Sequence, residues 1–553
     1  MNESVTSNEE KQKYQKLLEQ VTNLKNLRGE LDPLIEEVLY YVRQSTYSQG
    51  GMADFNVDRN KNEIFDPTAP WAATQFANGL GSFLTNSTDR WFSLGVMGRL
   101  TADLSKESRM NLEAAEDRIN HEYALPSVGF GSAMSELYLD IGALGTAVLF
   151  QDWDAQGKHV RFLPRTIKNT WIAESNFRRV DTVLSEWEVT KRQLLQYFPD
   201  FADHNLLKND DPTKKVTLSQ MVFPNKDREI YKFGKKGYKF SSVYFCSDYE
   251  LVLDEGGFSS FPYHVPRWMR LVGDVYGQSP AMQCLPAIQN ANQIMEELHV
   301  AARLANWPPI LHDDDSIVLP MGRTGPEFYP GSLVSMVPGT DRPTPLTSGS
   351  QPQYSHELLQ MQQKWITDAF HVSYLLREKK KERQSVTEIL DERSEMLRQM
   401  GSMLGRMQQE LLGPMVGRTY DLLRLNGEIA PPTDEMRELG MDIVFVNPAA
   451  KAQLGTKAQN MSAMLQDMAV VAQAKPEIYD IIKPVEWAEE LANVRDVSLK
   501  VLRTREEMEE IEAKKAEQQQ QQQAMEALPS MASGIKDIAQ ARQVDPEMAG
   551  LMS

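Results

Sequence analysis

The chain has 553 residues, of which 41% are hydrophobic and 25% are charged, so it is long enough for several structural units with buried cores. Its formal net charge of −18 excludes a protein that grips nucleic acid with most of its surface, so any contact with DNA must be local and basic. The most apolar stretch, residues 141–150, is too short to cross a bilayer, and no membrane partner is expected.

The N-terminal part of the chain has the residue spacing of helices. Apolar residues recur every three or four positions and predict one buried stripe, made of Leu17, Val21, Leu24, Leu27 and Leu31. A second helix is expected after Asp32-Pro33, because proline fits the first turn of a helix. Its apolar face is predicted to contain Leu34, Val38, Tyr41 and Val42. Further helices are predicted from the segment 64–71 to about Thr85, over 105–125 and over 131–145.

Between about residues 147 and 265 the apolar period changes from three or four residues to two. The segments rich in β-branched and aromatic residues predict strands at 160–163, 169–172, 183–189, 231–233 and 238–240. Gly234-Lys-Lys-Gly237 has the composition of a hairpin turn. A short helix is predicted from Lys191 to Tyr197. This part of the chain is therefore expected to form a sheet.

Two long helices are predicted to flank a small insert. Ser279-Pro280 supplies an N-cap and a first-turn proline, and Trp307-Pro308-Pro309 ends the first helix, which is roughly 40 Å long. Its apolar stripe is predicted to contain Ile288, Ala291, Ile294, Leu298, Ala301 and Leu304. Residues 310–350 are rich in Pro, Gly and Asp and predict a compact insert that contains strands. The second helix is expected over 355–376 with Leu358, Met361, Trp365 and Val372, so the two helices should lie antiparallel with the insert at their tip.

A basic segment follows the second of these helices. Residues 377–384 contain five bases and two acids, and Ser385 with Glu388 forms a capping box that begins the next helix. A heptad-like stripe is predicted in that helix, made of Leu397, Met400, Leu404, Met407, Leu411 and Met415. Because Gly413-Pro414 lies inside this pattern, a kink is expected there. Residues 431–527 are predicted to be mostly helical, and residues 528–553 to be flexible.

Motifs of known catalytic or cofactor sites are absent from the sequence. There is no phosphate-binding loop, dinucleotide fingerprint, HExxH motif or nucleophile elbow. His312-Asp313-Asp314-Asp315 could bind a hard cation but is more typical of a solvated acidic turn, and His121 and His371 are isolated. Cys246 and Cys284 lack metal-site spacing and are interpreted as reduced core thiols. We therefore expect a protein that is not an enzyme and has no catalytic residues, no cofactor and no metal.

The order of these segments resembles that of the portal, or head-to-tail connector, proteins of short-tailed bacteriophages. The resemblance is carried by Phe65-Asp-Pro-Thr-Ala-Pro-Trp71 with the following segments 80–85 and Trp91-Phe92. It continues in Arg267-Trp268, in Tyr276-Gly-Gln-Ser-Pro280 before the long helix, and in Val386-Thr-Glu-Ile-Leu390 before the next one. Together these segments span most of residues 1–430, whereas the last 120 or so positions match only in their helical pattern.

The resemblance implies a predominantly helical α+β fold that assembles into a ring of twelve subunits with a central channel. The regions that it implies are a wing (1–278, β-rich over 147–265), a stem helix (279–309), a clip (310–352), a second stem helix (353–376), a tunnel loop (377–386), a long kinked wing helix (387–430), a helical crown (431–527) and a flexible tail (528–553). The ring would lie at one capsid vertex of the virion, after assembly in the host cytoplasm, as the conduit for packaging and ejection of double-stranded DNA. Its expected partners are the major capsid and scaffolding proteins, the terminase and the tail adaptor proteins.

The basic segment is the part of the chain expected to face DNA. A loop at the reversal between two long helices could reach the channel, and Arg377, Lys379, Lys380, Lys381 and Arg383 could contact phosphates without sequence specificity. Taken alone, the same run is also typical of a solvated loop between helices. The rest of the acidic chain would repel phosphate and let a duplex slide.

Two other interpretations remain open at the level of sequence. The chain could be another ring-forming head-tail adaptor or scaffold protein of a phage particle, although the long helix-insert-helix segment argues against an adaptor. It could also be an enzyme with an unrecognised site. Measurement of particle mass separates these interpretations, because a portal forms a ring many times heavier than the 62.8 kDa chain.

Overall fold

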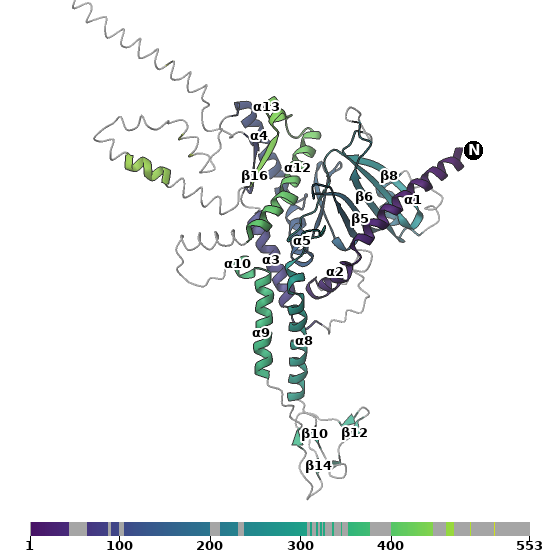
Figure 1. The fold of residues 1–553 in the computed structure, drawn as a ribbon, viewed down its shortest axis with the longest axis vertical. Helices are drawn as coiled ribbons and strands as arrows, with labels where there is room; N and C mark the ends of the chain where they lie inside the picture. The colour runs from purple at the N-terminus through teal and green to yellow at the C-terminus, as the bar shows by residue number, and fades with distance from the viewer. Residues whose placement is uncertain are drawn as a thin grey trace, which may run out of the picture. The chain divides into compact units, whose positions relative to one another are not determined.

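A computed structural model provides the description of the fold. The residues that it describes are 2–43, 64–86, 90–98, 104–199, 211–229, 237–306, 352–375, 400–445 and 460–468, six two-residue strands between 310 and 345, and the single residues 487, 491 and 514. The chain divides into two compact units. The first contains 1–94, 114–431 and 443–447, and the second contains 95–113, 432–442 and 448–553. The mixture of helices and sheets confirms an α+β fold (Figure 1).

The N-terminal helices α1 (Asn2–Arg28) and α2 (Asp32–Val38) are followed by a π-helix, Leu39–Arg43. Val21 and Leu24 of α1 pack on the sheet, as the stripe predicts, in a cluster with Trp171, Leu184 and Phe245. Leu27 does not belong to this stripe, because its side chain is 74% exposed. Arg28 is buried instead, and its guanidinium donates to the carbonyl oxygens of Lys168 (2.6 Å) and Thr170 (2.8 Å).

Three helices are found at the predicted positions: α3 (Thr68–Leu84), α4 (Lys106–Ala124) and α5 (Phe130–Leu144). α3 and α5 pack closely at Gly142, where a Cβ atom would lie 2.7 Å from the Phe76 ring. α4 runs from the second unit into the first. Trp91-Phe92 leads into a strand, β1 (Phe92–Val96).

Two antiparallel sheets of three or more strands are described in the first unit. The larger has the order β4-β5-β6-β7-β8 and the smaller the order β3-β2-β9. The strands are β2 (Val148–Asp154), β3 (His159–Arg165), β4 (Thr170–Glu174), β5 (Val180–Thr190), β6 (Lys215–Pro224), β7 (Phe240–Cys246), β8 (Leu251–Phe258) and β9 (Tyr263–His264). α6 (Lys191–Tyr197) has its predicted bounds and begins with a capping box of Thr190 and Gln193.

Two of the sheet predictions have a different outcome. Tyr238 and Lys239, predicted as strand, lie just before β7, which begins at Phe240. The predicted strand 231–233 and most of the predicted turn 234–237 lie outside the described residues.

The long helices α8 (Pro280–Asn306) and α9 (Pro352–Ala369) pack against each other, as Figure 1 shows. The segment between them contains three nested antiparallel strand pairs, which confirms that the insert contains strands. The pairs are β10 (Ile310–Leu311) with β15 (Thr344–Pro345), β11 (Ile317–Val318) with β14 (Ser335–Met336), and β12 (Met321–Gly322) with β13 (Gly325–Pro326). The acidic turn predicted at His312–Asp315 lies outside the described residues.

Two features of the second long helix differ from the prediction. α9 ends at Ala369, and a separate helix, α10 (Val372–Leu375), follows His371, whose backbone has a φ of 53°. The buried face of α9 consists of Leu359, Gln362 and Ile366 rather than Leu358, Met361 and Trp365. α9 packs against both α8 and α3, and this packing leaves Leu358, Met361 and Trp365 uncovered.

The heptad-like stripe after the basic segment is buried wherever it is described, at Met400, Leu404, Met407, Leu411 and Met415. A π-helix, Gln408–Leu412, interrupts the α-helix just before α12 (Gly413–Leu425). Because proline cannot donate a backbone hydrogen bond and crowds the preceding turn, this wider turn accommodates Pro414.

The region predicted to be mostly helical, 431–527, contains a strand. α13 (Asp434–Leu439) is followed by β16 (Met441–Phe445), whose residues alternate between half-buried and exposed. Residues 460–468 are helical. In the second unit, the Glu435 carboxylate accepts hydrogen bonds from the hydroxyls of Ser105 (2.9 Å) and Ser108 (2.8 Å) at the start of α4.

Candidate functional site at the base of the paired helices

The base of α8 begins with the cap that the sequence predicts. The Ser279 hydroxyl accepts a hydrogen bond from the Met282 amide at 2.9 Å, and Pro280 occupies the first turn, where no amide hydrogen is needed. Ser279 is completely buried. The start of the helix is therefore fixed inside the protein.

Two glycines let the chain approach closely at this base. Gly145 ends α5 with a φ of 71°, and a Cβ atom there would overlap the backbone of Gln278 and Ser279. Gly277 lies against the carbonyl oxygen of Gly145, and its amide donates to the Thr146 hydroxyl at 2.8 Å. These contacts join the end of α5 directly to the start of α8.

Trp268 is the apolar anchor of the same region. It is 1% exposed and lies edge-on to the Phe76 ring of α3, with 4.9 Å between ring centroids. Phe76 also contacts Phe370, at the break between α9 and α10, with 6.2 Å between centroids. α3, the segment before α8 and the end of α9 thus meet around one aromatic cluster.

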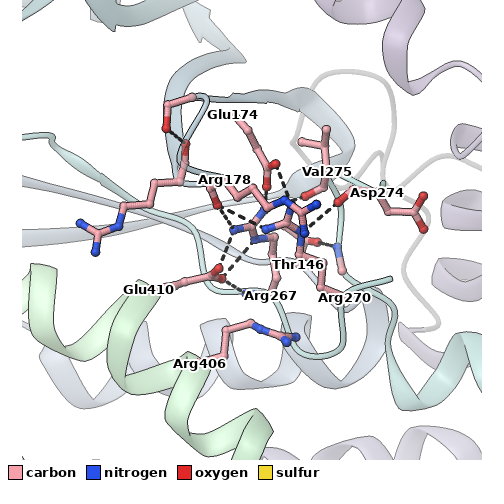
Figure 2. A network of polar contacts seen from close by, with 12 residues as sticks. Thr146, Glu174, Arg178, Arg267, Arg270, Asp274, Val275, Arg406 and Glu410 are labelled. Carbon is pink, nitrogen blue, oxygen red and sulfur yellow. Dashed lines mark hydrogen bonds and ion pairs between the residues drawn. The ribbon is translucent and has the colours of Figure 1, made fainter. Parts of the chain in front are cut away.

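Arg267, next to Trp268, forms the polar centre of the junction (Figure 2). It is 1% exposed, and its Nε and backbone N donate to one Glu410 oxygen at 3.1 and 3.0 Å. Its Nη1 atom donates to Glu174, at the end of β4, and to the Val275 carbonyl oxygen. The other carboxylate oxygen of Glu174 forms an ion pair with Arg270 Nη2 at 2.8 Å. We name these side chains, Arg267, Glu174, Glu410 and Arg270, the Arg267 junction.

The electrostatics of the junction keep Arg267 charged. Burial lowers the pKa of Arg267, but the hydrogen bonds and charges of Glu410 and Glu174 outweigh it, so the net shift is upward. Glu410 lies in the π-helix, and Arg406, one turn earlier, donates to the Trp268 carbonyl oxygen at 3.1 Å. The junction therefore connects the base of α8 to the larger sheet and to the helix that contains the π-turn. Its ion pairs hold these segments together, and the structure shows no other chemical role for them among the described residues.

A second polar chain lies between the smaller sheet and α12. His264 Nε2 contacts Gln151 Oε1 at 2.7 Å, and the Gln151 amide donates to the Thr419 hydroxyl at 2.8 Å. The Tyr123 hydroxyl meets the same Thr419 oxygen at 2.8 Å. Burial, followed by the charge of Arg418, lowers the pKa of His264 to about 3. His264 is therefore neutral at physiological pH.

The residues predicted to face DNA are Arg377, Lys379, Lys380, Lys381 and Arg383, and they all lie outside the described residues.

Cys246 and Cys284 are free and buried, and burial raises their thiol pKa values to about 11 and about 12. Among the residues that the structure describes, no group of three metal-ligating side chains occurs, and no helix has the length and apolarity needed to span a bilayer.

Sequence reasoning did not find the Arg267 junction as a site. Arg267-Trp268 belongs to the segments that carry the family resemblance, but the partners Glu174 and Glu410 lie 93 and 143 positions away. The Arg267-Trp268 pair before the long helix is the one feature of the sequence that points to this junction.

Comparison with known proteins places this architecture in a family. Residues 14–502 match the family model described as bacteriophage head to tail connecting protein. The chain belongs to this family. The connector is also similar to the portal protein of Salmonella phage epsilon15, with 24% identity over 96% of each chain. A probable portal protein of Bordetella phage BPP-1 is 24% identical over 81% of the connector and 82% of its own length. The connector is therefore a component of the phage particle that joins head and tail.

Proposed function

We propose that the connector is a portal subunit, and that twelve copies form a ring around a channel for double-stranded DNA at one capsid vertex. The match to the connector family and the two portal relatives support this proposal. In it, the terminase docks on the ring during packaging and tail adaptors dock on it afterwards. The role is structural rather than catalytic.

An exposed apolar seam on α9 is the structural observation that supports assembly most directly. We define the seam as Tyr354, Leu358, Met361 and Trp365, which are 69%, 44%, 41% and 52% exposed. Their spacing of four, three and four residues places them on one face, as in a coiled-coil seam. A second stripe of α9, made of Leu359, Gln362 and Ile366, lies about 100° around the helix from the seam and is already buried within the chain, so the seam is an additional apolar surface that stays exposed. We infer that a second copy of the chain covers the seam.

The dimensions of the helices fit a channel for a duplex. Twelve helices side by side at a spacing of roughly 10 Å give a ring about 38 Å in diameter. Subtraction of one helix width of about 10 Å leaves an opening of about 28 Å. A B-form duplex is roughly 20 Å across, judged from its groove depths, so one duplex passes with a thin layer of water.

The division into regions is part of the proposal. α8 and α9 correspond to the two stem helices (279–309 and 353–376), and the nested strand pairs lie in the clip (310–352). The segments before α8 and the helix with the π-turn correspond to the wing. The tunnel loop (377–386) would bring its basic side chains to the DNA.

The mass of the purified full-length protein tests the proposal. We expect mass photometry or native mass spectrometry to show a closed ring near twelve times the 62.8 kDa chain mass. Leu358→Ser with Trp365→Ser should shift the particles toward smaller species, whereas Gln360→Ser, on an exposed polar position of the same helix, should not. A protein that stays monomeric at all concentrations would overturn the proposal.

A further inference from the structure

A cavity of about 1010 Å³ opens beside the Arg267 junction. Its apolar floor includes Phe240, Tyr263 and Val265, each less than a tenth exposed. Two turns contribute to its rim, residues 175–179 between β4 and β5 and residues 270–274 before α8. The cavity is thus built from a buried sheet surface and two projecting turns.

Large apolar side chains are exposed on both turns. Phe177 is 86% exposed, Val272 is 89% exposed and Leu271 is 46% exposed, and all three line the cavity. Turns at a protein surface are usually polar, and apolar side chains gathered around one hollow mark an interaction site. These three side chains therefore indicate a surface that a macromolecular partner covers.

The lining is cationic, in contrast to the chain as a whole. Arg178, Arg179, Lys239 and Arg406 line the cavity, and none of them forms an ion pair within the part of the chain that the structure describes. Arg267 and Arg270 also line it, but Glu174 and Glu410 neutralise their charges. Since the whole chain carries a net charge of −18, this lining complements an acidic partner with an apolar contact.

α1 has a surface with the properties that such a partner needs, namely an exposed apolar side chain and nearby acidic residues. Leu27 is 74% exposed, Asn23 and Glu19 are exposed one and two turns earlier on the same side of α1, and Glu30 is exposed in the turn that follows the helix. We name these four residues the Leu27 face. An apolar side chain flanked by carboxylates matches a cavity with an apolar floor and cationic walls.

We propose that the cavity is a socket for the Leu27 face of a second copy of this chain. Because socket and face are different surfaces, each subunit can offer its face to one neighbour and its socket to another. Such a head-to-tail contact repeats around a ring until it closes. The inference rests on the proposed ring and names a contact between neighbouring subunits in addition to the α9 seam.

Nucleic acid fits the socket less well than a second copy does. The floor of the cavity is apolar and buried. A phosphate backbone would leave this floor unfilled, whereas the Leu27 face supplies an apolar side chain together with its acidic flanks.

Disulfide trapping tests the contact in the full-length protein. The chain has two cysteines, Cys246 and Cys284, and both are buried, so cysteines introduced on the surface report without interference. With Leu27→Cys and Phe177→Cys in one chain, mild oxidation should give a ladder of covalent multimers up to the complete ring. Either substitution alone should give no species larger than a dimer. Oxidised chains that stay monomeric within intact rings would overturn the inference.

Assembly measurements provide a second, independent test. Phe177→Ser with Val272→Ser should raise the protein concentration at half-assembly at least tenfold, and Asn176→Ser, in the same turn, should leave it unchanged. Phe177 and Val272 are both exposed, so we expect the double variant to fold as the wild type does. Unchanged assembly of the double variant, with or without loss of binding to DNA or another protein, would overturn the inference. A wild-type protein that does not form multimers would instead overturn the proposed ring.

Discussion

Arg267 shows how a single buried charge can connect distant segments. Its guanidinium is 1% exposed, but Glu174 and Glu410 supply two carboxylates and the Val275 carbonyl oxygen a further acceptor. A buried ion of this kind adds little net stability compared with apolar packing, but removal of one partner leaves an uncompensated charge. The junction is therefore sensitive to single substitutions.

Glu410→Ala should lower the free energy of unfolding by about 3 kcal/mol, because Arg267 stays buried without its bidentate partner. Glu410→Gln should cost less, since the amide oxygen still accepts one hydrogen bond. The matched control is Glu428→Ala, which removes a partly exposed ion pair with Arg118 and should cost at most about 1 kcal/mol. The shift of the urea midpoint, followed by tryptophan fluorescence, measures the difference. Equal shifts for Glu410→Ala and Glu428→Ala would contradict the role of the junction.

His264 makes stability depend on pH. Its folded-state pKa of about 3 lies below the ordinary value of 6.5, because burial, followed by the charge of Arg418, disfavours the imidazolium. Below pH 6.5 the unfolded chain binds a proton that the folded chain does not, so stability is lost as the pH falls toward 3. Asp140 acts in the opposite sense, because burial raises its pKa to about 6 and the folded chain then gains the proton first.

His264→Gln should therefore reduce the loss of stability between pH 6.5 and pH 5. The contribution of His264 is up to about 1.4 kcal/mol per pH unit in this window. Urea midpoints of both proteins at pH 7.5, 6 and 5 isolate this contribution, since Asp140 titrates in both. A constant difference between wild type and variant across the series would show that His264 does not control this dependence.

At the scale of elements, the close approach of backbones decides how α5, α8 and their flanking segments meet. Gly145 combines a positive φ of 71° with direct backbone contact to Gln278 and Ser279. Gly427 has a similar φ of 78°, but a Cβ atom there would have no neighbour within 4 Å. A substitution at Gly427 would therefore introduce only conformational strain, whereas a substitution at Gly145 would add steric overlap to the same strain.

Gly145→Ala should cost about 3 kcal/mol or more, because left-handed strain and overlap with immovable backbone add together. Gly427→Ala should cost only about 1 to 2 kcal/mol, from the strain alone. Thermal unfolding followed by circular dichroism compares the two variants. If Gly145→Ala is no more harmful than Gly427→Ala, the contact between α5 and α8 is not the constraint that the geometry indicates.

At the scale of the whole molecule, charge is the property that bears on DNA. The chain carries −18 overall, whereas residues 377–384 carry five bases and two acids. In a ring, an acidic wall would repel the duplex along most of the channel, and a basic loop from each subunit would contact phosphates without sequence specificity. Such a passage would guide DNA without holding it.

Neutralisation of Lys379, Lys380, Lys381 and Arg383 to glutamine should reduce DNA packaging or retention while rings still form. The reason is the loss of salt-dependent phosphate contacts from every subunit. The DNA content of particles and the mass of the rings are measured together. A matched control replaces four exposed cations elsewhere, Lys158, Arg192, Lys226 and Arg228. Normal packaging and retention with the loop neutralised would exclude the tunnel-loop role.

Local sequence patterns are enough to predict most of the helices and their order. Apolar spacing and capping residues placed α3, α4, α5, α6 and α8 within a few residues of their observed bounds, because these signals act within one or two turns. The buried stripe from Met400 to Met415 followed from the same local periodicity. The order of the motifs indicates the connector family without any knowledge of contacts between elements.

Which face of each helix is covered depends on contacts between elements that are distant in the sequence. Leu27 continues the apolar stripe of α1 and Trp365 is a large apolar residue of α9, yet both are exposed, because the neighbouring elements lie on other faces. The partners of Arg267 are 93 and 143 positions away, beyond the reach of any local pattern. The physical reason is that periodicity follows from the backbone of one element, whereas burial and ion pairing depend on elements that the chain brings together from a distance.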